Sequence, residues 1–207
     1  MSVKTAANRI ASELAKRLKE KGFKKKGGYM LTRKWGDGVA LVSCAVRKDA
    51  VSGALLGNLV LGIRFEEVEK VLARDRVGPD SPTIAVPIHL LHENRKFVEW
   101  NFDEPETVAV LYNELETYGL PFFEKYSNLN EVLLSFQSDD PFGWFTFSPA
   151  MRIGTICILL ALRGEQERAF ALLDKEIDLR RDAGIGKGLF LKKIRDNLSV
   201  MYGSGPS

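Results

Sequence analysis

The fold is decided by residues 29–46, which read YMLTRKWGDGVALVSCAV. The first seven residues alternate between two sets of side chains, as the two faces of a strand do, whereas residues 39–46 are apolar on nearly both faces. Between them, Gly36-Asp37-Gly38 tolerates the positive φ of a tight turn. The stretch predicts an antiparallel hairpin whose second strand lies centrally in a sheet.

Three more strands are predicted after this hairpin. Residues 59–65 place Leu, Ile and Phe on one face of a third strand. A fourth strand, 84–90, contains Pro87, which has no amide hydrogen and therefore belongs at a sheet edge. A fifth strand, 98–102, is expected to pair with the fourth across the polar loop 92–96.

The first helix is predicted over residues 3–21. Apolar residues recur at every fourth position from Ile10 to Leu18, as they do on one face of an amphipathic helix. Gly22 can adopt the left-handed conformation, and Phe23 can fold back onto Leu18. We therefore expect the helix to end there in a Schellman motif.

A second helix is predicted to begin at Asp103, in an acidic first turn, and to end at Gly119 and Leu120 as the first helix ends. Pro121 should prevent its continuation. Further helices are expected over 66–73, 129–136, 150–162, 165–182 and 187–201, with Gly164 separating the two helices on either side of it.

Strands that cluster early, with helices before and after them, indicate an α+β fold. We expect an antiparallel sheet of about five strands flanked by helices, with a helical C-terminal third. The expected division is a sheet domain over 1–148, a helical extension over 149–202 packed on it, and a flexible tail over 203–207. No Pro/Ser-rich linker separates these parts, so a single integrated unit is expected.

The composition is that of an ordinary globular chain, which excludes collagen-like, coiled-coil and wholly disordered proteins. The net charge of +3 conceals an uneven distribution: +9 over residues 1–50, −9 over 51–150 and +3 over 151–207. The basic and acidic parts either attract each other within the fold or present a bipolar surface to a partner. The positive net charge of the whole chain is therefore weak evidence for nucleic-acid binding.

Cys44 and Cys157 each lie in an apolar run, which is typical of small buried thiols in a reducing compartment. The N-terminus has no apolar core of a signal peptide, and the longest apolar stretch, 156–162, is too short to cross a bilayer. The sequence predicts a cytoplasmic protein with no membrane partner.

Basic residues gather around the predicted hairpin, with Tyr29 and Trp35 among them. A hairpin over 24–48 that combines phosphate contacts with aromatic stacking is one way to hold single-stranded nucleic acid. The alternative is a solvated sheet edge, where lysines prevent edge-to-edge association. The aromatic segment around Trp144 is either core or a partner anchor. The candidate binding residues are Lys24, Lys25, Lys26, Arg33, Lys34, Trp35 and Trp144.

The sequence offers no catalytic residues, no metal ligands and no cofactor motif. His89 is expected to end a strand and His92 to open a loop, and positions three apart on a strand face opposite ways, so the pair does not predict a metal site. The glycine-rich residues 184–188 lack the preceding strand and the following Ser/Thr of a phosphate-binding loop. We interpret them as a break between helices.

Three segments resemble a bacterial family catalogued as domain of unknown function 4304. They are the run Leu18-Lys19-Glu20-Lys21-Gly22-Phe23-Lys24-Lys25-Lys26-Gly27, the run Tyr118-Gly119-Leu120-Pro121-Phe122-Phe123, and Leu162-Arg163-Gly164-Glu165. The resemblance covers most of the chain, but its motifs are structural. It implies an uncharacterised domain, of which some similar bacterial proteins are suspected immunity partners of toxins, and it brings no catalytic residues.

The leading hypothesis is a non-catalytic protein that binds another protein, with a toxin-immunity-like module as one instance. A nucleic-acid-binding protein that uses the hairpin 24–48 is the second hypothesis. An enzyme with an unrecognised site is the third. The sequence leaves the oligomeric state open.

Overall fold

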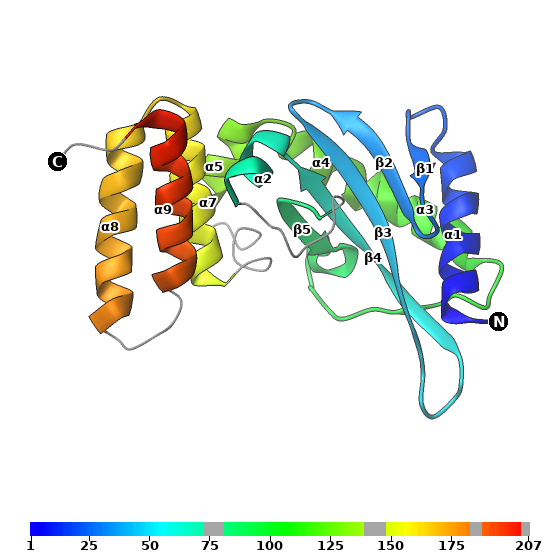
Figure 1. Cartoon of the computed structure of the whole chain (residues 1–207). Coiled ribbons are helices and arrows are strands. Elements are labelled where there is room, and N and C mark those ends of the chain that lie inside the picture. Colours follow the sequence, from blue (N-terminus) through cyan, green and yellow to red (C-terminus); the bar gives the residue numbers. More distant parts are fainter. Residues whose placement is uncertain (73–80, 139–147, 183–187, 204–207) are drawn as a thin grey trace. The chain divides into compact units, whose positions relative to one another are not determined.

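The computed structural model describes residues 1–72, 81–138, 148–182 and 188–203 (Figure 1). The chain divides into two compact units. The sheet unit comprises Met1–Arg64 and Pro82–Ser127, and the helical unit comprises Phe65–Ser81 and Asn128–Ser207. Each unit is described by itself below.

The sheet unit contains a six-stranded antiparallel sheet, which confirms the predicted α+β fold. The strand order is β1-β2-β3-β4-β5, and β6 pairs with β4 as well. The predicted hairpin joins β2 to β3, and β3 lies in the middle of the path, as expected. The strands are β1 (Lys24–Lys26), β2 (Met30–Trp35), β3 (Gly38–Lys48), β4 (Leu55–Arg64), β5 (Ile84–Pro87) and β6 (Trp100–Asn101).

The edge position of Pro87 is confirmed, because β5 ends the path of strands. The predicted length of this strand is wrong: after Pro87 the chain turns into a 3-10 helix, η1 (Ile88–Leu91). The predicted partner of the last strand is also wrong, since β6 pairs with Leu56 and Gly57 of β4 and not with β5. The physical reason is the length of β4: β5 pairs only with residues 60–63 of its edge, which leaves Leu56 and Gly57 available to β6.

One face of the sheet, the inner face, is covered by helices. The strand register aligns Leu31, Val42, Leu61 and Val86 in one row, and each of these side chains is buried. Helix α1 (Val3–Arg17) lies against the strands at one side of this sheet (Figure 1). Burial of this row against helices forms the core of the sheet unit.

The turn that follows α1 confirms the predicted Schellman motif, although the helix itself ends at Arg17 and not at residue 21. The amide of Phe23 donates to the carbonyl of Leu18 at 3.3 Å, and the amide of Gly22 donates to Lys19 at 2.9 Å. Gly22 has φ +80°, and both Phe23 and Leu18 are buried. The two hydrogen bonds are those of a Schellman motif at a left-handed glycine.

The predicted helix end at Gly119 is wrong. Helix α3 (Thr107–Glu114) continues through a π-helical turn, η2 (Leu115–Gly119), into α4 (Leu120–Lys125), and Gly119 has a helical φ of −72°. The wide turn accommodates Pro121, which has no amide hydrogen to donate. A Cβ at Gly119 would lie 3.0 Å from Cδ2 of Leu115 in the preceding turn and 3.4 Å from Cδ1 of Leu61 in β4, so the tighter contact is within the helix itself.

The predicted helix start at Asp103 is wrong as well, because α3 begins at Thr107. A carboxylate oxygen of Asp103 instead accepts a hydrogen bond from the amide of Leu55 at 3.1 Å. The acidic residue therefore satisfies the first amide of β4 and does not cap a helix.

The helical unit confirms a helical C-terminal part. Gly164, with φ +88°, separates α7 from α8 as predicted, and a Schellman pair of hydrogen bonds surrounds it. The side-chain amide nitrogen of Asn197 in α9 donates to the backbone carbonyl of Val71 in α2 at 2.7 Å. The helices are α2 (Glu66–Leu72), α5 (Leu129–Gln137), α7 (Pro149–Leu162), α8 (Gln166–Asp182) and α9 (Gly188–Tyr202). Within the described residues, no helix is long and apolar enough to cross a membrane.

Both cysteines are free and buried, as the sequence predicts. Burial raises the pKa of each thiol to about 12. Since only the thiolate attacks a disulfide reagent, we expect the folded protein to resist modification by an aromatic disulfide at pH 8, and the chain unfolded in guanidinium to react at two sites. Rapid modification of the folded protein would contradict the burial of Cys44 and Cys157.

Candidate binding face

The second face of the sheet, here called the outer face, carries a group of basic side chains. Side chains alternate between the two faces of a strand, and residues in register share a face. The register therefore places Lys24 with Thr32 and Leu41, Lys26 with Met30 and Ser43, and Lys34 with Val39 and Arg64. The basic residues of the outer face are Lys24, Lys26, Lys34, Arg47 and Arg64.

Three of the candidate binding residues are brought together on this face. Lys24, Lys26 and Lys34 are all exposed. Lys25 faces the other way, since it is in register with the inner-face residue Leu31, and its ammonium donates to the hydroxyl of Ser12 in α1 at 2.8 Å. The predicted lysine run therefore divides between two faces, and only part of it is presented outward.

Arg33 and Trp35 lie on the inner face and belong to an aromatic cluster. The guanidinium carbon of Arg33 is 4.0 Å from the centroid of the Trp35 ring. The Trp35 ring in turn packs against Phe23 and Phe123, with centroids 6.1 Å and 5.7 Å away. These two residues are therefore separated from the outer-face lysines. Trp144, the remaining candidate, lies outside the described residues.

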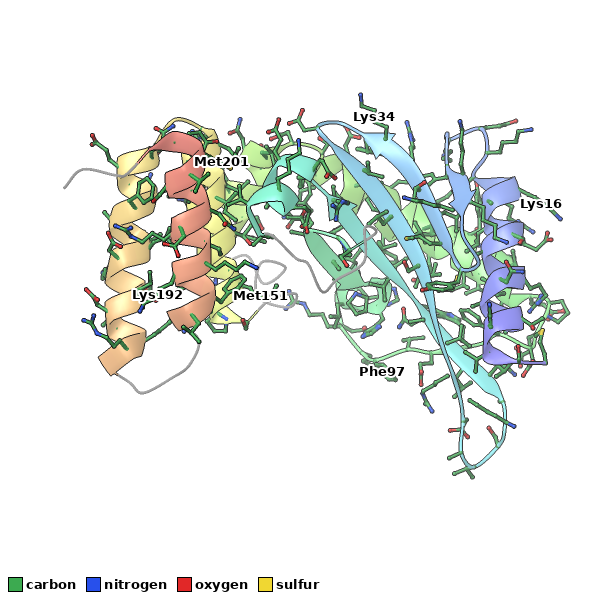
Figure 2. All side chains as sticks on the ribbon, viewed as in Figure 1. Lys16, Lys34, Phe97, Met151, Lys192 and Met201 are labelled. Atoms are coloured by element: carbon green, nitrogen blue, oxygen red, sulfur yellow. The ribbon has the colours of Figure 1, made fainter. Side chains whose placement is uncertain are left out.

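A pocket of about 260 Å³ opens at the part of the sheet where β3 and β4 meet η1. Apolar walls are provided by Val60, Pro87 and Phe97. Its polar lining consists of Asn58, His89 and the pair Arg47 and Glu99. Figure 2 shows Phe97 far from Lys34 within the sheet unit, so the pocket and the lysine group are separate features.

Asn58 fixes the tautomer of His89. The Asn58 amide nitrogen donates to the carbonyl of Val98 at 2.7 Å and lies 2.5 Å from Nδ1 of His89. Because an amide NH₂ only donates, Nδ1 accepts and the proton of the neutral imidazole is on Nε2. The ring packs edge-on against Phe97, with centroids 5.1 Å apart, and His89 is 6% exposed.

Arg47 and Glu99 form a two-pronged ion pair at the pocket. Nε of Arg47 donates to one carboxylate oxygen of Glu99 at 2.9 Å, and Nη2 donates to the other at 2.6 Å. Hydrogen bonding to Glu99 raises the pKa of Arg47 above its usual value. The planar fork holds the carboxylate in one orientation.

Acid should destabilise the folded protein through His89. Burial, followed by the positive charge of His92, lowers the pKa of His89 below 6.5. As the pH falls below about 6.5, the unfolded chain takes up a proton at this residue before the folded protein does, so the free energy of unfolding decreases until the pH passes the folded pKa. Urea unfolding between pH 8 and pH 5 should show that the free energy of unfolding falls more steeply with decreasing pH for the native chain than for His89→Gln. Equal pH dependence in the two proteins would contradict a lowered pKa of His89.

Asn58, His89, Phe97 and Glu99 were not predicted as one site. The available signal was a polar Asn58 inside the apolar run 55–63, but nothing in the sequence connects it with His89, 31 residues later.

His89 and His92 do not contact each other, because His92 contacts Glu114 at 2.5 Å and the ring of Tyr118. Among the described residues, no three metal-ligating side chains gather.

Comparison of the chain with protein-family models, with curated proteins and with solved structures finds no match. The functional argument therefore rests on the geometry of the outer face and its pocket.

Proposed function

We propose that the protein is a non-catalytic binding protein that recognises an acidic surface of another protein through the outer face of its sheet. The observation that carries the proposal is that the strand register places three exposed lysines, Lys24, Lys26 and Lys34, on this face. Complementary charge on a partner would orient it and increase its rate of association.

The surroundings of the lysines favour a protein partner over nucleic acid. Binding of single strands combines cations with aromatic platforms for the bases. Trp35, one of the two aromatic residues expected to provide such a platform, faces inward with Arg33 stacked on it. The outer face therefore retains the positive charge of the hairpin but not its tryptophan.

The size of the pocket agrees with this interpretation. Sites for drug-sized molecules usually enclose about 300–1,000 Å³. A pocket of about 260 Å³ is below that range and suits a single side chain from a partner. A toxin held by an immunity protein is one partner of this kind, in line with the bacterial family that the sequence resembles.

Charge reversal on the outer face tests the proposal. A protein captured with the native chain should associate about tenfold more slowly or worse with the variant that carries Lys24→Glu, Lys26→Glu and Lys34→Glu. The difference should vanish in about 0.5 M salt, because screening shortens the reach of surface charges.

The matched control reverses three exposed lysines at the N-terminal helix and its end, Lys4, Lys16 and Lys19, with the same change in net charge. It should associate nearly as fast as the native chain. Equal slowing of both triple variants would contradict the proposal. Capture of a nuclease-sensitive nucleic acid that the outer-face variant loses would establish the nucleic-acid alternative instead.

A further inference from the structure

We propose that an extended segment of the partner adds as a further strand to the free edge of β3, with an acidic residue opposite Lys48. This inference rests on the proposed function and names how such a partner is held. Strand β3 runs to Lys48, but β2 pairs with it only over Gly38–Ser43. Figure 1 shows the hairpin of β3 and β4 continuing past the end of β2. The part of β3 beyond Cys44 therefore has a strand on one side only.

The backbone groups of Val46 and Lys48 point toward this free edge. Successive residues of an antiparallel strand direct their amides and carbonyls to alternate sides. The amide of Cys44 donates to Tyr29 at 3.0 Å on the side of β2, whereas the amide of Asp49 donates to β4 at 2.8 Å. Val46 and Lys48 follow the alternation of Cys44, and no described strand pairs with them on that side. Such a row of unpaired backbone groups is a template for another strand.

The two strands that end the sheet offer shorter templates. Strand β1 contains only Lys24–Lys26, and the alternation leaves Lys25 alone to direct its backbone groups outward. Strand β5 ends in Pro87, which has no amide hydrogen to donate. The free stretch of β3 is therefore the best place in the described sheet for strand addition.

The side chain of Lys48 favours an acidic segment as the added strand. Lys48 is exposed, and no residue that the structure describes bonds to its ammonium. The adjacent carboxylate of Asp49 is engaged elsewhere, because it accepts from the amide of Ser52 at 2.8 Å and from Arg47 at 3.4 Å. A carboxylate of the partner would therefore neutralise a charge that the chain itself leaves unpaired.

The alternation of faces then fixes a short pattern in the partner. Val46 and Lys48 share the inner face with Val42, and the residues opposite them in an antiparallel strand lie on that face, two positions apart. An acidic residue opposite Lys48 is thus followed, two positions later, by an apolar residue that covers the half-buried Val46. A second copy of β3 would bring further cations, Arg47 and Lys48, to this edge, so self-pairing is disfavoured.

The test uses two blocked peptides as probes of the purified chain: acetyl-Thr-Thr-Glu-Thr-Val-Thr-Thr-amide and the same peptide with lysine in place of glutamate. Threonine favours the extended conformation. We expect the glutamate peptide to shift the backbone amide NMR signals of Val46 and Lys48 saturably, and that of Ala85 in β5 little. The lysine peptide should bind about fivefold more weakly, because it places like charges opposite each other. The glutamate peptide methylated at every amide nitrogen should not bind, since it has no hydrogen bond to donate.

Reversing the charge at Lys48 separates this contact from general attraction. Lys48→Glu should reverse the preference, so that the lysine peptide binds about fivefold more tightly than the glutamate peptide. The control is Lys19→Glu, at an exposed lysine after α1, which makes the same change in net charge and should keep the native preference.

The inference is overturned if the two peptides bind the native chain alike, if Lys48→Glu keeps the native preference, or if the methylated peptide binds as tightly as the unmethylated one. A dimer in sedimentation that protects the amides of Val46 and Lys48 from hydrogen exchange would also overturn it, because the occupant would then be a second copy of the chain.

The two proposals fail separately. The charge reversal of Lys24, Lys26 and Lys34 tests the outer face with a captured partner, whereas the two peptides test the edge of β3. Failure of the peptides, together with a partner that the charge reversal slows, removes only the strand addition. Success of the peptides with a partner indifferent to the charge reversal removes the outer face and leaves the edge as the recognition site.

Discussion

Gly36→Ala is expected to lower the free energy of unfolding by about 3 kcal/mol or more. Gly36 occupies the first position of the two-residue loop between β2 and β3 and has φ +53°, as a type II′ turn requires. A Cβ there would lie 2.0 Å from the carbonyl oxygen of Ser127 and 2.8 Å from its carbon. Both are backbone atoms, so no side-chain rotation relieves the clash. The same carbonyl accepts the amide of Asp37 at 2.9 Å, and a shift would break that bond.

The matched control for this substitution is Gly27→Ala. Gly27 has a similar φ of +66°, but no atom lies within 4 Å of the Cβ it would gain. It should show only the backbone penalty, about 1–2 kcal/mol. Urea or thermal unfolding of the two variants separates the clash from the conformational strain. If Gly36→Ala is no less stable than Gly27→Ala, the contact between the hairpin and Ser127 is incorrect.

Phe123→Ala is expected to lower the free energy of unfolding by about 3–5 kcal/mol. Phe123 is fully buried at the centre of the aromatic cluster, with ring centroids 5.9 Å from Phe23, 5.7 Å from Trp35 and 5.6 Å from Phe122. It thereby joins the end of α1, the end of β2 and α4. Truncation leaves a cavity where these three elements meet, and the rigid sheet can fill little of it.

Phe97→Ala provides the control, because Phe97 is largely exposed and its removal should change stability by no more than about 0.5 kcal/mol. Denaturant unfolding of both variants at one pH makes the comparison. A loss for Phe123→Ala as small as that for Phe97→Ala would contradict the central position of the cluster.

Local signals predicted much of the fold. Three of these features each depend on a glycine that adopts a positive φ within a short stretch of chain. They are the hairpin at Gly36, the helix end at Gly22 and the break at Gly164. The central place of β3 follows from its apolar character on both faces. These features were predictable because residues close in the sequence decide them.

The wrong predictions depend on residues distant in the sequence. Gly119 has the same sequence context as a helix end, yet the chain continues into α4, whose Phe122 and Phe123 are buried in the core. The partner of β6 depends on how much of β4 is left uncovered by β5. Neither fact is visible in the neighbouring residues.

The candidate site was predicted only in part for the same reason. The lysines and the hairpin were evident, but the grouping of Arg33 and Trp35 with Lys34 ignored the alternation of faces along β2. The division of the lysine run depends on the register of β1 with β2. The pocket forms because the fold brings His89 next to Asn58, and no local sequence motif predicts that contact.

Lysine acetylation of the protein alone and in complex with its captured partner is the most direct test of recognition through the outer face. Mass spectrometry gives the degree of modification at each residue. We expect the partner to protect Lys24, Lys26 and Lys34 and to leave Lys4, Lys16 and Lys19 as reactive as in the protein alone. Protection of the second group without the first would contradict recognition through the outer face.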